Sequence, residues 1–410
     1  MNKSTPDQAF LRETNLSTVL RLIQAQRPVS RAKLATVTGL NKSTVSSLVD
    51  DLLERKLIHE TGINSKATGR PATLLEISPS VGYIIGVELG VDFVSVGIAD
   101  FLGNLIWRKK EDSDPIQAQD RMISQMFKII KEALAVGRKK GLRFLGIGLA
   151  TPGTVDLKEG VLVFAPNLHW KNVPFRKIFS EKTNLRVFIE NDANAATIAE
   201  HLFGAGKMTR HFIFIFAGVG IGGGLFLNGE LYRGKNGYAG EIGHSPIIGG
   251  TQQNVCHCGN RDCWETYVNQ YSIIQRVQAR LHVKRNSMIP RLMMEQGVPL
   301  SFSLIKQAAD AGDAEAIESL TEAGIAMGQG LAGLINIFNP EKIILGGPLS
   351  IAGDYLMPAI HQVISRHTLP EIDQQAEVVL SSFGPDASLI GATAIVVDAV
   401  LSNPSQVERR

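Results

Sequence analysis

The hydrophobic pattern of the first 80 residues predicts three short helices followed by two strands. Apolar residues recur at helical spacing within residues 14–26, and Pro28 ends this helix. Ser30 and Asn41 are of residue types that cap helix N-termini, so a second and a third helix are expected after them. The third helix, residues 42–56, carries an apolar stripe of Val45, Leu48, Val49, Leu52 and Leu53.

The residues between the second and third predicted helices are typical of a helix-turn-helix. Ala35 is small enough for close helix approach, Gly39 permits the turn, and Val45 locks the third helix in place. Ile58 and Leu74–Ile77 are expected in two strands joined by a polar tip. The pattern therefore predicts a winged helix-turn-helix.

Beyond Val81 the pattern changes to strands alternating with helices. Residues 83–109 contain three strand-like runs, and an amphipathic helix is expected at about 117–139. A buried strand ending in Pro-Gly follows at 142–153, and residues 187–204 are expected to pass from strand to helix. Two further strands surround the glycines of 211–229. This order predicts an α/β body made of two similar halves.

Composition and charge place a domain boundary near residue 80. The chain has 410 residues, of which 44% are hydrophobic, so more than one domain with a sizeable core is expected. Residues 1–80 carry a net charge of +4 and residues 81–410 a net charge of −1. No apolar run is judged long enough to span a bilayer, and the N-terminus lacks the apolar core of a signal peptide. We therefore expect a cytoplasmic protein with a basic DNA-binding domain, residues 1–80, on a larger body, residues 81–410, and no membrane partner.

The segment 240–265 contains a candidate metal site. It holds all three cysteines of the chain, and a histidine lies upstream in the spacing H-x11-C-x-C-x4-C. Three thiolates and one imidazole form a common tetrahedral site for structural zinc. The predicted ligands are His244, Cys256, Cys258 and Cys263. The alternatives are a buried thiol cluster, or a disulfide with one thiol left over.

The third predicted helix presents polar side chains suited to DNA. In a helix-turn-helix this helix enters the major groove by its N-terminal turns. The side chains expected there are Lys42, Ser43, Thr44, Ser46 and Ser47. Arg70, held between Gly69 and Pro71, suits insertion into a narrow A·T minor groove. The alternatives are a solvated helix in a protein-interaction domain and a simple turn at the wing tip.

Several motifs together resemble the ROK family, which comprises repressors, open reading frames and sugar kinases. They are GEIGH, CxCGxxxCWE, LGIGLATPGTVD, NLHWKNVP, ENDANAA, INIFNPEKIILGG and SLIGATA, and they cover essentially the whole chain in order. The turn before the third cysteine, residues 260–262, departs from the family's usual GxxG. The resemblance implies an actin-like (ribonuclease H-like) body with two lobes, a zinc loop and a sugar site in the cleft between them.

By this resemblance five polar side chains face the sugar. They are Asn191, Asp192, Glu241, His244 and Glu265. Asp192 matches the carboxylate that takes the sugar hydroxyl proton in the kinases, and His244 would use one ring nitrogen for sugar and the other for zinc. The alternative is that these residues are surface and helix-capping groups.

The phosphate-binding loops of the family's kinases are altered in this chain. Their Asp-x-Gly-x-Thr corresponds to residues 88–92, where Val91 and Asp92 replace a glycine and a hydroxyl residue. A carboxylate facing a phosphate would repel it by about 4 kcal/mol at contact. The second loop, residues 218–224, keeps its glycines but has Val219 where the kinases have threonine. Phosphoryl transfer is therefore expected to be lost.

These observations predict a sugar-responsive transcriptional regulator, most simply a repressor, and not an enzyme. It would bind a palindromic operator as a homodimer or a dimer of dimers and release it when a sugar effector binds. One competing hypothesis is an ATP-dependent sugar kinase with a DNA-binding appendage. Another is a module controlled by a protein partner instead of a sugar.

Overall fold

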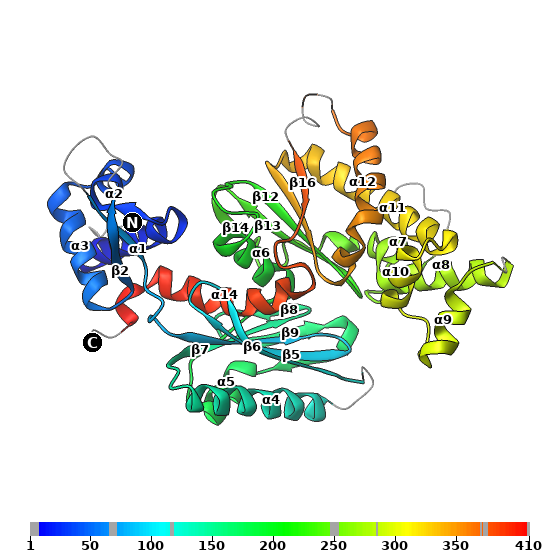
Figure 1. The fold of residues 1–410 in the computed structure, drawn as a ribbon, viewed down its shortest axis with the longest axis horizontal. Coiled ribbons are helices and arrows are strands. Elements are labelled where there is room, and N and C mark those ends of the chain that lie inside the picture. The colour runs from blue at the N-terminus through cyan, green and yellow to red at the C-terminus, as the bar shows by residue number, and fades with distance from the viewer. Residues whose placement is uncertain are drawn as a thin grey trace.

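A computed structural model describes residues 8–64, 72–114, 119–246, 254–283, 286–369, 371 and 376–407. Figure 1 shows a small N-terminal head at one side and two larger lobes beside it, with the C-terminal helix α14 (Ala387–Ser402) running from the head to the point between the lobes. This arrangement confirms the predicted α/β class.

The head contains three helices and a small sheet. Its elements are α1 (Gln8–Ala25), β1 (Val29–Ser30), α2 (Arg31–Thr38), α3 (Lys42–Glu54), β2 (Ile58–Asn64) and β3 (Ala72–Ile77). The sheet has the order β1-β3-β2, so it contains one strand more than was predicted. A two-residue strand carries no alternating pattern, which is why β1 was missed. Helix α1 also begins earlier than the predicted residue 14. Its first turns were missed because they are exposed and lack an apolar stripe.

The helix-turn-helix geometry follows from three local signals that were recognised in the sequence. The Ser30 side chain accepts a hydrogen bond from Lys33 N at 3.2 Å, and the Asn41 side chain accepts one from Thr44 N at 2.7 Å. Gly39 has φ = +70°, a left-handed conformation that suits glycine. Val45 is buried at the centre of the head.

The first lobe is built on a five-stranded sheet of order β11-β7-β4-β5-β6. Strands β4 and β5 and strands β5 and β6 pair antiparallel, whereas β7 lies parallel to both β4 and β11. The bounds are β4 (Tyr83–Leu89), β5 (Phe93–Asp100), β6 (Leu105–Asp112), α4 (Gln119–Lys139), β7 (Phe144–Thr151), α5 (Phe175–Thr183) and β11 (Val187–Asn191). A second small sheet contains β8 (Thr154–Asp156), β9 (Val161–Ala165) and β10 (Trp170–Val173).

The second lobe repeats the strand order of the first. Its sheet is β14-β13-β12-β15-β16, which corresponds element by element to β6-β5-β4-β7-β11. The bounds are α6 (Asp192–Phe203), β12 (Phe212–Ala217), β13 (Ile221–Leu227), β14 (Glu230–Tyr232), β15 (Lys342–Gly346) and β16 (Glu377–Leu380). The remaining helices are α7 (Glu265–Val268), α8 (Gln270–Val283), α9 (Ile289–Gln296), α10 (Phe302–Asp310), α11 (Ala314–Phe338) and α12 (Gly353–His367). The repeated order confirms the prediction of two similar halves.

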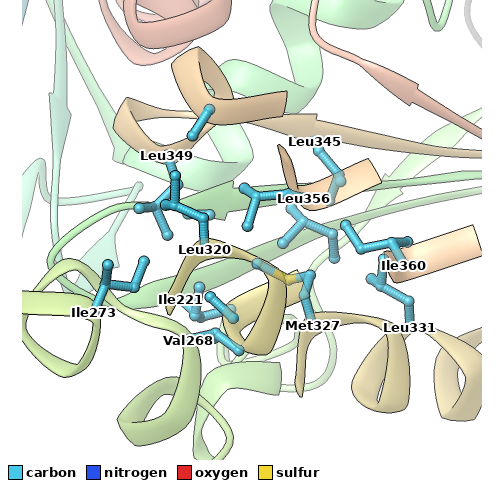
Figure 2. Close-up of a cluster of buried hydrophobic side chains, with 14 of the residues drawn as sticks. Ile221, Val268, Ile273, Leu320, Met327, Leu331, Leu345, Leu349, Leu356 and Ile360 are labelled. Carbon is cyan, nitrogen blue, oxygen red and sulfur yellow. The ribbon is translucent and has the colours of Figure 1, made fainter. Parts of the chain in front are cut away.

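A dry core holds the second lobe together. Figure 2 shows Leu320, Met327 and Leu331 of α11 facing Leu356 and Ile360 of α12, all of them buried. Burial of this much apolar surface is the main source of the lobe's stability, at about 25 cal/mol per Å². The core fixes the sheet that carries one wall of the cleft.

Helix α14 corrects the expectation that no apolar run in the chain is long enough to span a bilayer. The segment Gly384–Ser402 is long and apolar enough to cross a membrane by length and composition, although no such run was recognised in the sequence. However, 72% of the apolar window is buried inside the protein. The helix packs on β4 and β7 of the first lobe and on α6, so its hydrophobicity is that of a core helix.

Candidate functional site

A cleft of about 1020 Å³ lies between the two lobes. Strand ends and hairpins from both sheets line it, as expected where parallel strands terminate at one edge. All five residues that were predicted to contact sugar line this cleft: Asn191, Asp192, Glu241, His244 and Glu265. The structure therefore brings together side chains that are up to 74 positions apart in the sequence.

Asn191 and Asp192 stand where β11 passes into α6. The Asn191 side chain accepts hydrogen bonds from Ala193 N at 3.0 Å and Asn194 N at 3.2 Å, and it donates to Gly153 O at 3.1 Å. Asn191 is thus a helix cap as well as a cleft residue, and much of its hydrogen-bonding capacity is used within the protein. Asp192 accepts from Ala193 N at 2.8 Å.

The glycines of β13 let α6 approach the sheet closely. A Cβ added at Gly224 would lie 1.7 Å from Thr197 Oγ1, and one at Gly222 would lie 3.1 Å from the Ala193 side chain. This glycine run therefore has a packing role that does not depend on phosphate. The close approach brings the N-terminus of α6, with Asp192, into the cleft.

The other three predicted residues come from the segment 241–265. His244 lies in the short 3-10 helix η2 (Ile242–His244), with its Nε2 3.7 Å from Glu241 Oε2. Its Nδ1 lies 3.7 Å from Glu265 Oε1. Glu265 is buried and its Oε2 accepts from Ile221 N at 3.3 Å.

The three cysteines and His244 form a compact cluster within the same segment. Their ligand atoms all lie within 4.8 Å of one another. His244 Nδ1 is 3.6 Å from Cys256 Sγ, and Cys258 Sγ is 3.7 Å from Cys263 Sγ. The two nitrogens of one imidazole thus face different neighbours, the thiols on one side and Glu241 on the other. Such a cluster can hold a metal ion.

Two carboxylic acids of the cleft, the buried Glu88 and the half-buried Asp192, have raised pKa values. Burial raises the pKa of Asp192 to about 7, and the nearby Glu241 charge acts in the same direction. Burial also raises the pKa of Glu88 to about 8, against the opposing effect of Lys110. A protonated acid can donate a hydrogen bond to a sugar oxygen, whereas a carboxylate can only accept.

The two altered loops are hairpins at the cleft. Residues 88–92 join β4 to β5, where Gly90 N donates to Phe93 O at 2.9 Å. Residues 218–220 join β12 to β13. Val91, Asp92 and Val219 all line the cleft, so the substitutions noted in the sequence lie at its wall.

Several cleft residues were not predicted. Asn167 of the first lobe and His257 of the cysteine loop both line the cleft, and their side chains are 3.0 Å apart. Outside the cleft lining, Arg233, which follows β14, forms an ion pair with the buried Glu190 of β11 at 2.6 Å, and this contact was not predicted either. Asn167 lies within the NLHWKNVP motif, which was the one available signal. The Arg233–Glu190 and Asn167–His257 contacts join segments that are distant in the sequence, so no local sequence pattern predicts them.

The N-terminal face of α3 presents the predicted DNA-facing residues. Lys42, Ser43 and Ser47 are exposed, while Thr44 and Ser46 are half-buried. Ser43 Oγ donates to Asn41 Oδ1 at 2.8 Å, which ties it to the helix cap. The predicted Arg70 lies outside the described residues.

Comparison with known proteins extends these observations. The model of the ROK family matches residues 84–399. The xylose repressor of Caldicellulosiruptor bescii is 31% identical over 398 residues, which cover 97% of this chain and 99% of that protein.

Two solved structures resemble the chain to different extents. The structure of a ROK family transcriptional regulator, a homologue of the E. coli MLC protein, has a TM-score of 0.79 and 29% identity, covering 96% of this chain and 97% of its own. A ROK family glucokinase from Streptomyces griseus, in complex with glucose and AMPPNP, has a TM-score of 0.69 and 29% identity. It covers 77% of this chain and 99% of its own, so the transcriptional regulator matches nearly the full length while this kinase matches a smaller part.

Proposed function

This chain belongs to the ROK family, and we propose that it is a sugar-responsive transcriptional repressor that releases its operator when a sugar enters the cleft. One observation carries the proposal. A winged helix-turn-helix is joined by residues 78–82 to a body whose cleft gathers the five predicted sugar-binding residues. The domain limits that we propose are residues 1–80 and 81–410.

The effector class follows from the chemistry of the cleft. Carboxyl, amide and imidazole groups converge on one space, and such groups hydrogen-bond the hydroxyls of a sugar ring. The similarity to a protein named xylose repressor makes D-xylose the first sugar to test. Asn191, Asp192, Glu241, His244 and Glu265 are the residues that we propose to contact it.

We propose that His244, Cys256, Cys258 and Cys263 bind one structural zinc ion. Zn–S bonds of about 2.3 Å and Zn–N bonds of about 2.0 Å give tetrahedral edges of about 3.5–3.8 Å. Two of the six ligand pairs, His244 Nδ1–Cys256 Sγ and Cys258 Sγ–Cys263 Sγ, lie 3.6 and 3.7 Å apart, which fits these edges. The ion would hold the loop and would turn His244 Nε2 toward the sugar.

The chain is proposed to have no kinase activity. Asp92 and Val91 occupy the hairpin where a nucleotide phosphate would need a hydroxyl and a close backbone. Asp192 keeps the place of the kinase's base, but in this proposal it only binds the sugar.

On the DNA side, Lys42 is proposed to contact phosphate. Ser43, Thr44, Ser46 and Ser47 would contact phosphates or base edges in the major groove. Arg70 would enter the flanking minor groove. Two copies of the chain would bind the two halves of a palindromic operator in the cytoplasm.

The test has two stages. A duplex is first selected from a random DNA library by the unaltered protein, and its Kd is then measured with and without D-xylose and a panel of hexoses. The unaltered protein is expected to bind the duplex and to release it with one of these sugars. Asp192→Asn should still bind the duplex but resist release, and the exposed Asp354→Asn on α12 serves as the matched control.

Three results would contradict the proposal. The first is failure to select any duplex. The second is release of Asp192→Asn at the same sugar concentration as the unaltered protein, which would place the effector elsewhere. The third is sugar-dependent ATP consumption, which would support the kinase hypothesis.

A further inference from the structure

Two helices cross at the centre of the molecule, and their contact is unusually close. A Cβ added at Gly391 of α14 would lie 2.4 Å from the Ala195 carbonyl carbon of α6 and 2.5 Å from Ala196 N. The two backbones therefore touch at this point. In Figure 1, α14 continues from this crossing to the head.

Both helices begin at the cleft. Asp192 is the first residue of α6, and Asp386 immediately precedes α14; both line the cleft. The helices belong to different lobes, because α6 packs on β12 and β13 whereas α14 packs on β4 and β7. A relative movement of the lobes must therefore change how α6 and α14 cross.

The far end of α14 holds the head. Ser17 Oγ donates to Leu401 O at 2.7 Å. Arg21 Nη2 lies 2.8 Å from Asp398 Oδ1 and 2.6 Å from Ser402 Oγ. Apolar residues of α1 join the same buried cluster as residues of α14 and α6: Leu16, Val19, Leu20, Ile23, Ile198, Leu202, Ile395 and Leu401.

The chain beyond α14 adds a second clamp on the head. The 3-10 helix η5 (Pro404–Gln406) follows α14. Arg55, at the end of α3, donates to Ser405 O at 3.0 Å and Val407 O at 2.7 Å. Ser405 N donates to Glu13 Oε1 at 3.1 Å, and Val407 is buried. The C-terminal segment thus contacts the first helix of the head and the end of its recognition helix.

The far end of α6 also lies at the head. Burial lowers the pKa of His201 near the end of α6, and the charge of Arg21 on α1 acts in the same direction. In the loop after α6, burial lowers the pKa of Lys207, and the charge of Arg27 acts in the same direction. Ile198 and Leu202 of α6 also belong to the buried cluster that contains α1 residues, so the far ends of both crossing helices share this cluster with the head.

We propose that closure of the cleft changes the orientation of the head through the α6–α14 pair. The two helices would pivot at their crossing at Gly391. This inference rests on the proposed function. Sugar bound at Asp192 would change the orientation of the two lobes relative to each other. The far ends of α6 and α14 would pass that change to α1 and α3. The connector, residues 78–82, attaches the head, while the helix pair sets its orientation.

The first test alters the crossing and measures the head. Gly391→Ala should force α6 and α14 apart, whereas Gly333→Ala on α11 adds a Cβ with nothing within 4 Å and is the matched control. Hydrogen exchange of α1 is measured with neither DNA nor sugar present. We expect at least threefold faster exchange in Gly391→Ala, from weaker docking of the head, and no change in Gly333→Ala. Unchanged exchange of α1 in a folded Gly391→Ala protein would overturn the inference.

The second test keeps the crossing and weakens the docking. Asp398→Asn removes a half-exposed ion pair with Arg21 and is expected to fold, and Glu295→Gln removes the exposed pair with Arg291 on α9 as its control. We expect Asp398→Asn to bind D-xylose with the unaltered thermal shift. The factor by which D-xylose weakens duplex binding, typically about 5–150-fold in allosteric proteins, should fall at least threefold.

The outcomes separate the two proposals. If the unaltered protein shows no sugar-dependent release, the proposed function fails, while the hydrogen-exchange test still decides whether the crossing controls the head. If the unaltered protein responds and Asp398→Asn responds by the same factor, the inference fails and the proposed function stands.

Discussion

At the scale of single residues, two acids with raised pKa values, the buried Glu88 and the half-buried Asp192, line the cleft. The charge of Asp192 contributes to the raised pKa of Glu88. Their pKa values are raised to about 8 for Glu88 and about 7 for Asp192, so both groups change protonation state near neutral pH. A cleft that binds sugar through neutral acid groups will change its hydrogen-bonding pattern when these groups lose their protons.

This gives a prediction for stability against pH. Both acids bind protons more tightly in the folded protein than in the unfolded chain, so their stabilising contribution is present at low pH and is lost as pH rises from about 4 through about 8. The double variant Glu88→Gln/Asp192→Asn, whose amides cannot ionise, should lose less stability between pH 5 and pH 8. Urea midpoints at the two pH values measure this, with Glu295→Gln as the surface control. An equal loss in the double variant and the unaltered protein would contradict the assignment.

At the scale of elements, the turn between α2 and α3 depends on one glycine. Gly39 and Gly297 both end helices in the left-handed conformation, with φ of +70° and +64°, and a Cβ at either position meets nothing within 4 Å. Alanine at either site should therefore cost about 1 kcal/mol of backbone strain. Only Gly39→Ala should also weaken duplex binding, because only that turn positions the recognition helix. Equal duplex affinity of Gly39→Ala and Gly297→Ala would argue against α3 as the DNA-binding helix.

The cysteine loop gives a second prediction at this scale. Elemental analysis should find one zinc per chain in the unaltered protein and a loss of zinc in Cys258→Ser. His257→Ala changes the residue between two proposed ligands without removing a ligand, so it should retain the metal. D-xylose should no longer raise the melting temperature of Cys258→Ser, since His244 would lose its support. A metal-free protein with a normal sugar response would exclude a zinc role.

These elements also show what can be predicted from a sequence. Ser30, Gly39 and Asn41 act through neighbours three or four positions away, so their local chemistry was sufficient. The contact between Ser17 and Leu401 spans 384 positions, and the hydrogen bond between Asn167 and His257 spans 90. No sequence pattern near these four residues predicts their partners, because both contacts depend on how the lobes and the head pack. For the same reason Asn191 was recognised as a cleft residue but its bond to Gly153 was not.

At the scale of the whole molecule, the proposed dimer makes a geometric prediction. Two heads held rigidly on two bodies can reach only half-sites on the same face of the duplex, one helical turn or a multiple apart. Insertion of five base pairs between the half-sites should reduce affinity to that of a single half-site, because the second site rotates to the opposite face. Titrations of duplexes with zero, five and ten inserted base pairs test this. Indifference to the five-pair insertion would mean that the heads are flexibly attached.

The clamp of the C-terminal segment on the head also has a consequence for biosynthesis. Residues 398–407, which cover one side of the head, are synthesised more than 300 residues after it. At 5–20 residues per second, roughly 15 to 70 s separate the two events. During that interval α1 packs only on the other elements of the head, and the part of its surface that contacts α14 and η5 lacks its partner. The full set of contacts that holds the head against α14 and η5 can therefore form only after residue 407 has been synthesised.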